Sequence, residues 1–448
     1  MPRLPFTVGM MSGTGPDTEL PLLQPSDLTY LGSMKYPHSG TSTYNGGGKV
    51  IAFAEDGGGA FGRGTIFCSG HDYDPEGGQM NLRVPVPGGT LGALPSMTAA
   101  QGGTAGIDMY GGKWNSQIPS SIAMFQGGLF PRDDGKLLVS QYIGYDGQYL
   151  GTYSHFVSEQ DFTPGPPTVS DGIAIDCPGL GISGGQGGWY GQTMCKIPEP
   201  WQGPLGGNMI CTGYGMSVAG RTSYGPDAII VDCDQFGVVN PVPGQRLLGY
   251  PAAHATLFDV APNDEIYITE WNWGSQQYNG VVFPEGTSTI CYFAGHGYGP
   301  PTFAVEERPG TGIFIGDPLR YGNGTNNPGP GGANAAGTVY SYNPTTFAID
   351  YNIYDPANLS RGYKGYPYRQ QVWLYDVRDL LRVKAGEIEY WEVRPYYSGV
   401  FGNVTAPFQT NGARIYGATY DPTRRIIYLS AQSTDGGYPL IHAYSVPY

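Results

Sequence analysis

One acidic turn in the sequence has the spacing of a calcium ligand set. Residues 70–78 read GHDYDPEGG and place Asp72, Asp74 and Glu76 at alternate positions before two glycines. Calcium loops present oxygen ligands at every second residue in this way, but their twelfth position is a bidentate glutamate. Arg83 stands at that position here. The turn therefore predicts either a calcium site or a solvated acidic loop, and calcium is the one cofactor that the sequence indicates.

A second group has the residue types of an acid–base pair. His254, Asp259 and Glu270 lie within one short stretch, and carboxylates beside a histidine would suit glycoside hydrolysis or lyase chemistry at a surface that also holds His71. Asp259, however, lies in the strand-like repeat FDVAPND, which favours a structural role. The sequence has no Gly-x-Ser-x-Gly elbow, phosphate loop or His-Glu-x-x-His pattern. We therefore expect no catalytic residue and keep an enzyme as the alternative.

Aromatic residues in polar surroundings form the third candidate site. The segments GGWYGQ (187–192) and TEWNWGSQQYNG (269–280) set tryptophans and tyrosines among Gly, Gln and Asn. Such rings could stack on sugars beside amide hydrogen-bond partners, pack against a neighbouring subunit, or belong to the core. The predicted binding residues are Trp189, Tyr190, His254, Trp271, Trp273 and Tyr278.

Composition restricts the classes of partner. Among 448 residues, 23 basic and 37 acidic side chains give a net charge of −14, and only 13% are charged, against about 25% in a typical soluble domain. No basic stripe is present to hold phosphates, so we expect no nucleic-acid partner. A sparsely charged surface instead suits other protein subunits or surface glycans.

Targeting and redox signals are few. No stretch reaches 18 apolar residues, so we expect no membrane insertion, and the first residues lack the regions of a Sec signal peptide. The six cysteines form no Cys-x-x-Cys pair, which argues against zinc. Most of them lie in or beside apolar strand runs, where buried free thiols are common. The sequence alone does not decide whether any two of these cysteines form a disulfide.

The elements that would position these residues form a repeat. The final unit, IYGATYDPTRRIIYLSAQ followed by PLIHAYSV, is a strand, a polar turn, a strongly apolar strand and a third strand. Similar units open with the segments 49–72, 127–142, 215–234, 255–271 and 302–317, and a further strand pair is expected at 338–354. Repeats of this kind are typical of propeller blades. The sequence predicts an all-β propeller of six to seven blades, with 370–377 as an outer strand of the sixth blade. Long Gly-rich loop insertions are expected at 88–120, 163–207 and 318–337. A helix of one or two turns is expected within 376–391.

The chain ends are expected to close the ring. Residues 27–37, DLTYLGSMKYP, read as a strand without a partner of its own. Pairing with the C-terminal strands would complete the last blade and remove two exposed edges. The predicted organisation is an N-terminal arm over 1–26 and a propeller over 27–448.

A resemblance covers most of the chain, from Leu22 to Val446. The segments LLQPSDLTYLGSMKYP, YDPANLSRGYKGYPYRQQVWLYDVRDLL and GATYDPTRRIIYLSAQSTDGGYPLIHAYSV resemble a family of uncharacterised propeller-like proteins of bacteria and bacteriophages. The resemblance implies a propeller and supplies no catalytic residues. Bacterial members often carry a secretion signal, and its absence here favours a protein assembled in the cytoplasm, as virion components are.

These observations lead to one expected function with two alternatives. We expect a non-catalytic structural or binding propeller of an extracellular assembly, first of all a tail or capsid-associated protein of a bacteriophage virion. The alternatives are a carbohydrate-active propeller, either a polysaccharide lyase or a glycosidase, and a bacterial cell-surface or filament protein.

Overall fold

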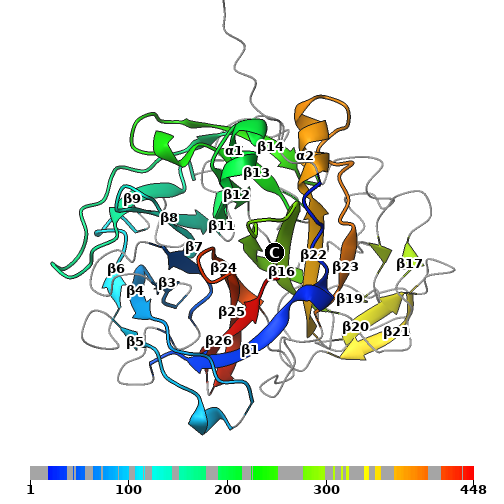
Figure 1. Cartoon of the computed structure of the whole chain (residues 1–448), viewed down its shortest axis with the longest axis horizontal. Coiled ribbons are helices and arrows are strands. Elements are labelled where there is room, and N and C mark those ends of the chain that lie inside the picture. Colours follow the sequence, from blue (N-terminus) through cyan, green and yellow to red (C-terminus); the bar gives the residue numbers. More distant parts are fainter. Residues whose placement is uncertain are drawn as a thin grey trace, which may run out of the picture.

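The chain folds into β-sheets arranged around an axis (Figure 1). The computed structural model describes residues 19–37, 44, 47–55, 64–71, 74–88, 90–99, 106–114, 116, 124–143, 151–177, 190–213, 223, 226–250, 276–297, 306–307, 314–315, 319–321, 338–342, 349–354, 368–401, 415–435 and 437–447. Within these residues, five sheets form the blades of a β-propeller.

Four blades follow one another along the chain, and each is built of antiparallel neighbours. Blade 1 contains β2 (Ile51–Ala54), β3 (Thr65–Ser69), β4 (Glu76–Asn81) and β5 (Thr98–Ala99), and β6 (Ile107–Asp108) also pairs with β4. Blade 2 contains β7 (Met124–Pro131), β8 (Lys136–Ile143) and β9 (His155–Glu159). Blade 3 contains β11 (Tyr190–Lys196), β12 (Met209–Gly213), β13 (Ala228–Val231) and β14 (Val242–Leu248), with β10 (Ile175–Asp176) parallel to β14. Blade 4 contains β15 (Gln276–Val282), β16 (Thr289–Gly297), β22 (Tyr368–Asp376) and β23 (Tyr397–Val400).

Blade 5 joins the two ends of the chain. Its strands are β24 (Ile415–Asp421), β25 (Ile426–Asp435), β26 (Tyr438–Ser445) and β1 (Thr29–Lys35). The pairing expected between residues 27–37 and the C-terminal strands is present, because β1 runs antiparallel to β26 from Thr29 opposite Ser445 to Lys35 opposite Leu440. In Figure 1 the blue β1 lies beside the red β26.

Contacts between the innermost strands show that the ring has five members. In the described part of the chain, β24 contacts β2, β2 contacts β7, β7 contacts β11, β11 contacts β15, and β15 returns to β24. Five hydrophobic clusters fill the spaces between adjacent blades, one for each pair. Both observations replace the expected six to seven blades with five.

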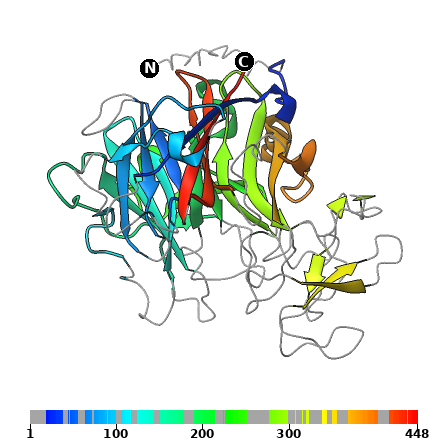
Figure 2. The same cartoon turned by 90° about the horizontal axis from the view of Figure 1, so that it is seen from below.

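The extra strands that suggested more blades belong to an insertion in blade 4. They are β17 (Glu306–Glu307), β18 (Phe314–Ile315), β19 (Leu319–Tyr321), β20 (Thr338–Tyr342) and β21 (Ile349–Tyr354), and they form two small sheets of their own. The yellow strands of this group lie outside the ring in both views (Figure 2). The segment 370–377 was expected as the outer strand of a sixth blade, but all of it except Val377 lies in β22, which pairs with β16 of blade 4 over nine residues. Strands are present within 302–317 (β17, β18) and 338–354 (β20, β21), but they form neither a sixth nor a seventh blade.

The Gly-rich segments are partly regular structure. Residues 88–120 include β5 and β6, and 163–207 include β10, β11 and the short helix α1 (Glu199–Leu205). β11 is an innermost strand although its sequence, YGQTMCK, is poor in apolar residues. Innermost strands crowd each other: a Cβ on Gly280 of β15 would lie 2.5 Å from the Cβ of Ala418 in β24. The close approach of strands near the axis therefore requires glycine there. These glycines weaken the apolar pattern from which a strand is predicted.

Two helices cover the junction of blades 3 and 4. The helix expected within 376–391 is present as α2 (Val377–Lys384), whose first turn is capped by the Asp376 carboxylate. The helix α1 buries Trp201, whose indole N–H donates to the Thr287 carbonyl at 3.2 Å. Short 3₁₀ helices occur at Pro25–Asp27, Leu91–Ala93 and Cys233–Gln235. Among the described helices, none has the length and apolar character needed to cross a membrane.

The described part of the proposed arm packs on the propeller. The Leu23 amide donates to Thr289 Oγ1 at 2.9 Å, and the Ser288 amide donates to the Pro21 carbonyl at 3.0 Å. Leu23 is fully buried in the cluster between blades 4 and 5, and Leu20 packs against the cluster between blades 3 and 4. Residues 19–28 therefore run along the edge of blade 4 before β1 begins.

Candidate functional site

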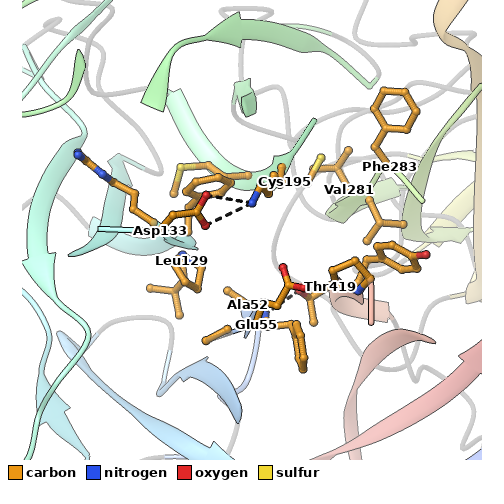
Figure 3. A pocket seen from close by; sticks show the side chains of 18 of the residues that line it. Ala52, Glu55, Leu129, Asp133, Cys195, Val281, Phe283 and Thr419 are labelled. Atoms are coloured by element: carbon orange, nitrogen blue, oxygen red, sulfur yellow. Dashed lines mark hydrogen bonds and ion pairs between the residues drawn. The ribbon is translucent and has the colours of Figure 1, made fainter. Parts of the chain in front are cut away.

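The innermost strands of all five blades end around one small cavity on the ring axis, here called the axial cavity. Its volume is about 100 Å³. Strands β2, β7, β11, β15 and β24 each contribute residues from near the carboxyl end of the strand to the wall of this cavity (Figure 3). The wall is mainly apolar. Representative lining residues are Ala52, Leu129, Met194, Val281, Phe283 and Thr419.

Charged side chains form the rim of the axial cavity. Lys196 Nζ lies 3.2 Å from both carboxylate oxygens of Asp133, and this ion pair is drawn as dashed lines in Figure 3. Both side chains are more than half exposed, so the pair adds little to stability. Glu55 accepts a hydrogen bond from Thr423 Oγ1 at 3.2 Å, and Glu285 is exposed in the turn after β15. Apart from the ion pair, Glu55 and Glu285 make this rim negative.

Two further residues give the rim fixed hydrogen-bonding groups. Burial, and then the neighbouring Glu285 carboxylate, raise the pKa of Tyr420 to about 12, so its phenol keeps its proton at neutral pH. The Arg132 guanidinium, 9% exposed, donates to the Phe236 carbonyl at 3.0 Å and to the Asp134 carboxylate at 2.7 Å. The arginine is held by its own neighbours and its charge is offset at this position.

A wider groove adjoins the axial cavity between blades 2 and 3. Its volume is about 450 Å³, and it shares Arg132, Asp133 and Lys196 with the cavity. Asn208 and Asp234 line its other side. Acidic, basic and amide side chains all line this groove, so it can both donate and accept hydrogen bonds.

The buried histidines lack the exposure that catalysis needs. His442 Nδ1 lies 2.7 Å from Ser33 Oγ, which lies 2.6 Å from the Tyr30 hydroxyl. This resembles a nucleophile with its base, but Ser33 is fully buried and His442 is 2% exposed. Burial lowers the pKa of His442 to about 4. The group is a neutral hydrogen-bonded link between β1 and β26, closed to any substrate.

A second histidine has a thiol beside it. His155 Nε2 lies 3.6 Å from Cys211 Sγ, and both residues are fully buried. Burial lowers the pKa of His155 to about 3 and raises that of Cys211 well above its usual value. Both side chains are neutral near pH 7, so the pair does not provide the thiolate that a nucleophilic cysteine requires.

One buried ion pair lies within blade 3, close to blade 4. Arg246 Nη1 lies 3.5 Å from Asp227 Oδ2, with side chains 1% and 0% exposed. The Gly213 amide donates to both Asp227 carboxylate oxygens at 2.9 and 3.0 Å, and the Tyr292 hydroxyl of blade 4 donates to the Asp227 carbonyl at 2.9 Å. A buried pair with these extra hydrogen bonds would be costly to break. The pair therefore stabilises blade 3 from within, and the hydrogen bond from Tyr292 to the Asp227 carbonyl links this part of blade 3 to blade 4.

Most residues of the predicted aromatic site fall outside the described part of the chain. Trp189, His254, Trp271 and Trp273 lie outside it, as do Asp259 and Glu270 of the predicted acid–base group. Tyr190 begins β11 and is 1% exposed, with its ring in the core between blades 2 and 3. Tyr278 lies in β15 opposite Ala294.

The predicted calcium turn is described only in part. Asp72 lies outside the described residues, Asp74 is exposed, and Glu76 begins β4 opposite Asp108. Among the described residues, no three His, Cys, Asp or Glu side chains come together to hold a metal ion. All six cysteines are free thiols.

The rim residues were missed by sequence reasoning, although a signal exists. At the ends of β2, β7 and β15 the sequence reads FAED (53–56), FPRDD (130–134) and FPEG (283–286), and these three segments contain Glu55, Asp133 and Glu285. The repeat therefore places charges at one mouth of the ring. This pattern is visible only once the correct innermost strands are known.

Comparisons with known proteins assign neither a family nor an activity to the chain. No protein-family model matches the sequence, and no curated protein matches it. A crystal structure of a glycosyl hydrolase from Bacteroides ovatus is similar to the chain at 9% sequence identity, covering 94% of each chain with a TM-score of 0.33. This likeness is too distant to carry an argument about function.

Proposed function

We propose that this protein is a non-catalytic binding propeller, a structural subunit of an extracellular assembly, with a bacteriophage virion as the first candidate. The observation that carries the binding role is the axial cavity, where an apolar wall from five blades lies beneath a charged rim. The virion assignment rests on the sequence resemblance described above.

The size of the axial cavity favours a protein side chain as its ligand. Pockets that enclose small-molecule ligands usually measure about 300–1,000 Å³, and an engineered apolar cavity of roughly 150 Å³ admits benzene. The volume here is about 100 Å³, which is the scale of one apolar side chain. A buried anchor in a pocket with a charged rim is a common arrangement at protein interfaces.

The charges of the rim would give such an interface its specificity. Glu55 and Glu285 are exposed on one side and the Lys196–Asp133 pair on the other. Complementary charge at a rim affects association rate and partner choice more than affinity. A partner that inserts an apolar residue and carries a base beside it would match this surface.

Particle sedimentation tests the proposed function. Extracellular particles from the encoding organism are banded by density, and the protein is quantified in each fraction together with the Glu285→Lys variant. We expect the wild type in the particle band and the variant depleted at least tenfold there. Glu389→Lys is the matched control, since Glu389 is exposed on the connection after α2 and away from the cavity. Wild-type protein confined to the free fraction would refute the virion role, and recovery with cell envelopes would favour a cell-surface or filament protein.

A carbohydrate-active enzyme is the second candidate, because the same rim brings together carboxylates from three blades. Glycoside hydrolysis needs a pair of carboxyl groups flanking the bond, and Glu55, Asp133 and Glu285 line one mouth. Asp133 is already paired with Lys196, which leaves the two glutamates. Cleavage of any polysaccharide in a panel, lost in both Glu55→Gln and Glu285→Gln, would promote this candidate over the binding role.

A further inference from the structure

The groove between blades 2 and 3 shares part of its wall with the axial cavity. Pro131, Arg132 and Lys196 line both spaces. The groove has a volume of about 450 Å³, against about 100 Å³ for the cavity, and sites that enclose a whole ligand usually measure about 300–1,000 Å³. A partner that places one apolar side chain in the cavity therefore has its neighbouring residues beside the groove.

The Lys196–Asp133 ion pair stands at this shared wall (Figure 3). Its side chains are 53% and 81% exposed, and a pair as exposed as this contributes little, so both groups can exchange partners. The lysine ammonium donates hydrogen bonds and the aspartate carboxylate accepts them. An extended peptide presents one N–H and one C=O at almost every residue. The pair can therefore hold the backbone of a segment that passes from the cavity into the groove, whatever its side chains.

Asp234 is the groove carboxylate whose contacts within the described chain are longest. Its side chain is 69% exposed, and its oxygens lie 3.5 Å from Asn208 Nδ2, 3.6 Å from Cys233 Sγ and 3.9 Å from Arg132 Nη2. Asp134, by contrast, accepts a hydrogen bond from the same arginine at 2.7 Å. Because Arg132 also lines the cavity, its contact with Asp234 brings this carboxylate close to the shared wall. Asp234 is thus accessible to a basic side chain of the partner.

The composition of the groove favours a basic peptide over a sugar or an anion. Phe130 is the aromatic residue of the groove as described, and at 6% exposed it offers no free face on which a sugar ring could stack. The lining holds three aspartates against one arginine and one lysine, so it is negative and disfavours anionic ligands. A peptide with a lysine or arginine satisfies both the charge and the hydrogen-bonding groups of the groove.

We propose that the partner of this protein docks as an extended peptide segment, with an apolar anchor in the axial cavity and a lysine or arginine paired with Asp234 in the groove. The base lies one to three residues from the anchor, since three extended residues span about 10 Å. The inference rests on the proposed function, because it takes the cavity as the site of the partner's anchor. It adds a second position that selects the partner, separate from the glutamates of the rim.

Selection from a random peptide library tests the inference. The full-length protein is immobilised, and binders are selected from a displayed library of twelve-residue linear peptides. We expect the enriched peptides to share an apolar residue with a lysine or arginine within three positions. Fluorescence anisotropy of one such peptide should show about tenfold weaker binding to Asp234→Asn. Asp176→Asn is the matched control, because Asp176 is exposed in β10 of the same blade and lies outside the groove lining, and it should bind as the wild type does.

A charge exchange makes the test specific to this contact. Replacing the base of the peptide by glutamate should abolish binding to the wild type and restore it on Asp234→Lys, and thermal melts verify that each variant is folded. A photo-leucine at the anchor position should link to Met194 or Val281 in the cavity wall.

The outcomes separate the inference from the proposed function. Anchor links to the cavity combined with unchanged binding to Asp234→Asn would overturn the inference and leave the cavity as a docking site. A library without binders, or binders without the base, would also overturn it, while particle sedimentation would still decide the proposed function.

Discussion

The hydrogen-bonded link between Ser33 and His442 makes ring closure sensitive to pH. A histidine in the unfolded chain has a pKa near 6.5, and burial lowers that of His442 to about 4. As the pH falls through 6.5, the unfolded chain takes up a proton that the folded protein accepts only near pH 4. The stabilising effect is therefore complete above pH 6.5 and is lost as the pH falls toward 4.

The size of this effect follows from the two pKa values. The difference between a pKa near 6.5 and one near 4 is worth about 3 kcal/mol in the free energy of unfolding, and about 2 kcal/mol of it is lost between pH 7 and pH 4.5. His442 is 2% exposed, so solvent screening does not reduce this value much. The total stability of a protein is typically about 5–15 kcal/mol, so the loss is large enough to measure.

The assay compares variants by urea unfolding at pH 7, 5.5 and 4.5. His442→Asn keeps an acceptor near Ser33 Oγ but cannot titrate, so its stability should fall by about 2 kcal/mol less than that of the wild type over this range. Ser33→Ala is the matched control. It loses the 2.7 Å hydrogen bond and about 1–3 kcal/mol at pH 7, but it retains the titrating ring and hence the wild-type pH dependence.

One result would refute the reasoning about His442. Carboxylates protonate in part of the same range, and His155 is also buried with a pKa near 3, so only the difference between variants is informative. If wild type and His442→Asn lose the same free energy between pH 7 and 4.5, burial does not hold His442 neutral. The closing strand would then have no histidine-linked pH dependence.

Three other predictions concern the closing strand, one glycine and the thiols. Deleting residues 1–38 removes β1 together with the buried side chains of Leu23, Leu28 and Met34, which are worth about 5–9 kcal/mol, so the protein should aggregate or unfold. Deleting 1–18 should move the melting temperature by only about 2 °C; equal melts would show that the ring closes without β1. Gly32 has φ +132° and its Cβ would lie 2.3 Å from the Val86 carbonyl carbon, so Gly32→Ala should lower the melting temperature well below that of Gly92→Ala, a site with no heavy atom within 4 Å. The six free cysteines are buried or partly buried, and burial raises the pKa of each thiol. A thiol reagent at pH 8 should therefore label the native protein far more slowly than the urea-unfolded protein. Rapid labelling of several thiols in the native protein would contradict their burial.

The propeller class and its closure could be predicted because their signals are local. β25 and β26 are strongly apolar runs on either side of a polar turn, and residues 27–37 carry a strand pattern without a neighbour to pair with. The number of blades could not be predicted in this way. The strand pairs at 302–321 and 338–354 have the same local pattern as blade strands, and only the pairing of β16 with β22 across them shows that they are an insertion.

The candidate site was harder to predict than the fold for a related reason. Its residues come one or two at a time from turns in different blades, so Glu55 and Glu285 are far apart in sequence and meet only through ring closure. The innermost strands β11 and β15 contain Gly and Gln where a strand pattern would require apolar residues, because neighbours approach closely at the axis. Tyr190 was predicted from its Gly-rich surroundings to bind a ligand, yet those glycines mark a crowded strand and the ring lies in the core.

The ladder between β16 and β22 has a consequence for how such a protein can diversify. Its last pair sets Gly297 opposite Tyr368, so the chain leaves blade 4 and returns to it at adjacent points. The length and sequence of residues 298–367 are thereby separated from the geometry of the blade, since any segment that begins and ends at those two points preserves the ladder. Lineages can exchange one insertion for another at this position while the ring is inherited unchanged. The same position is a natural place to graft a foreign domain in the laboratory.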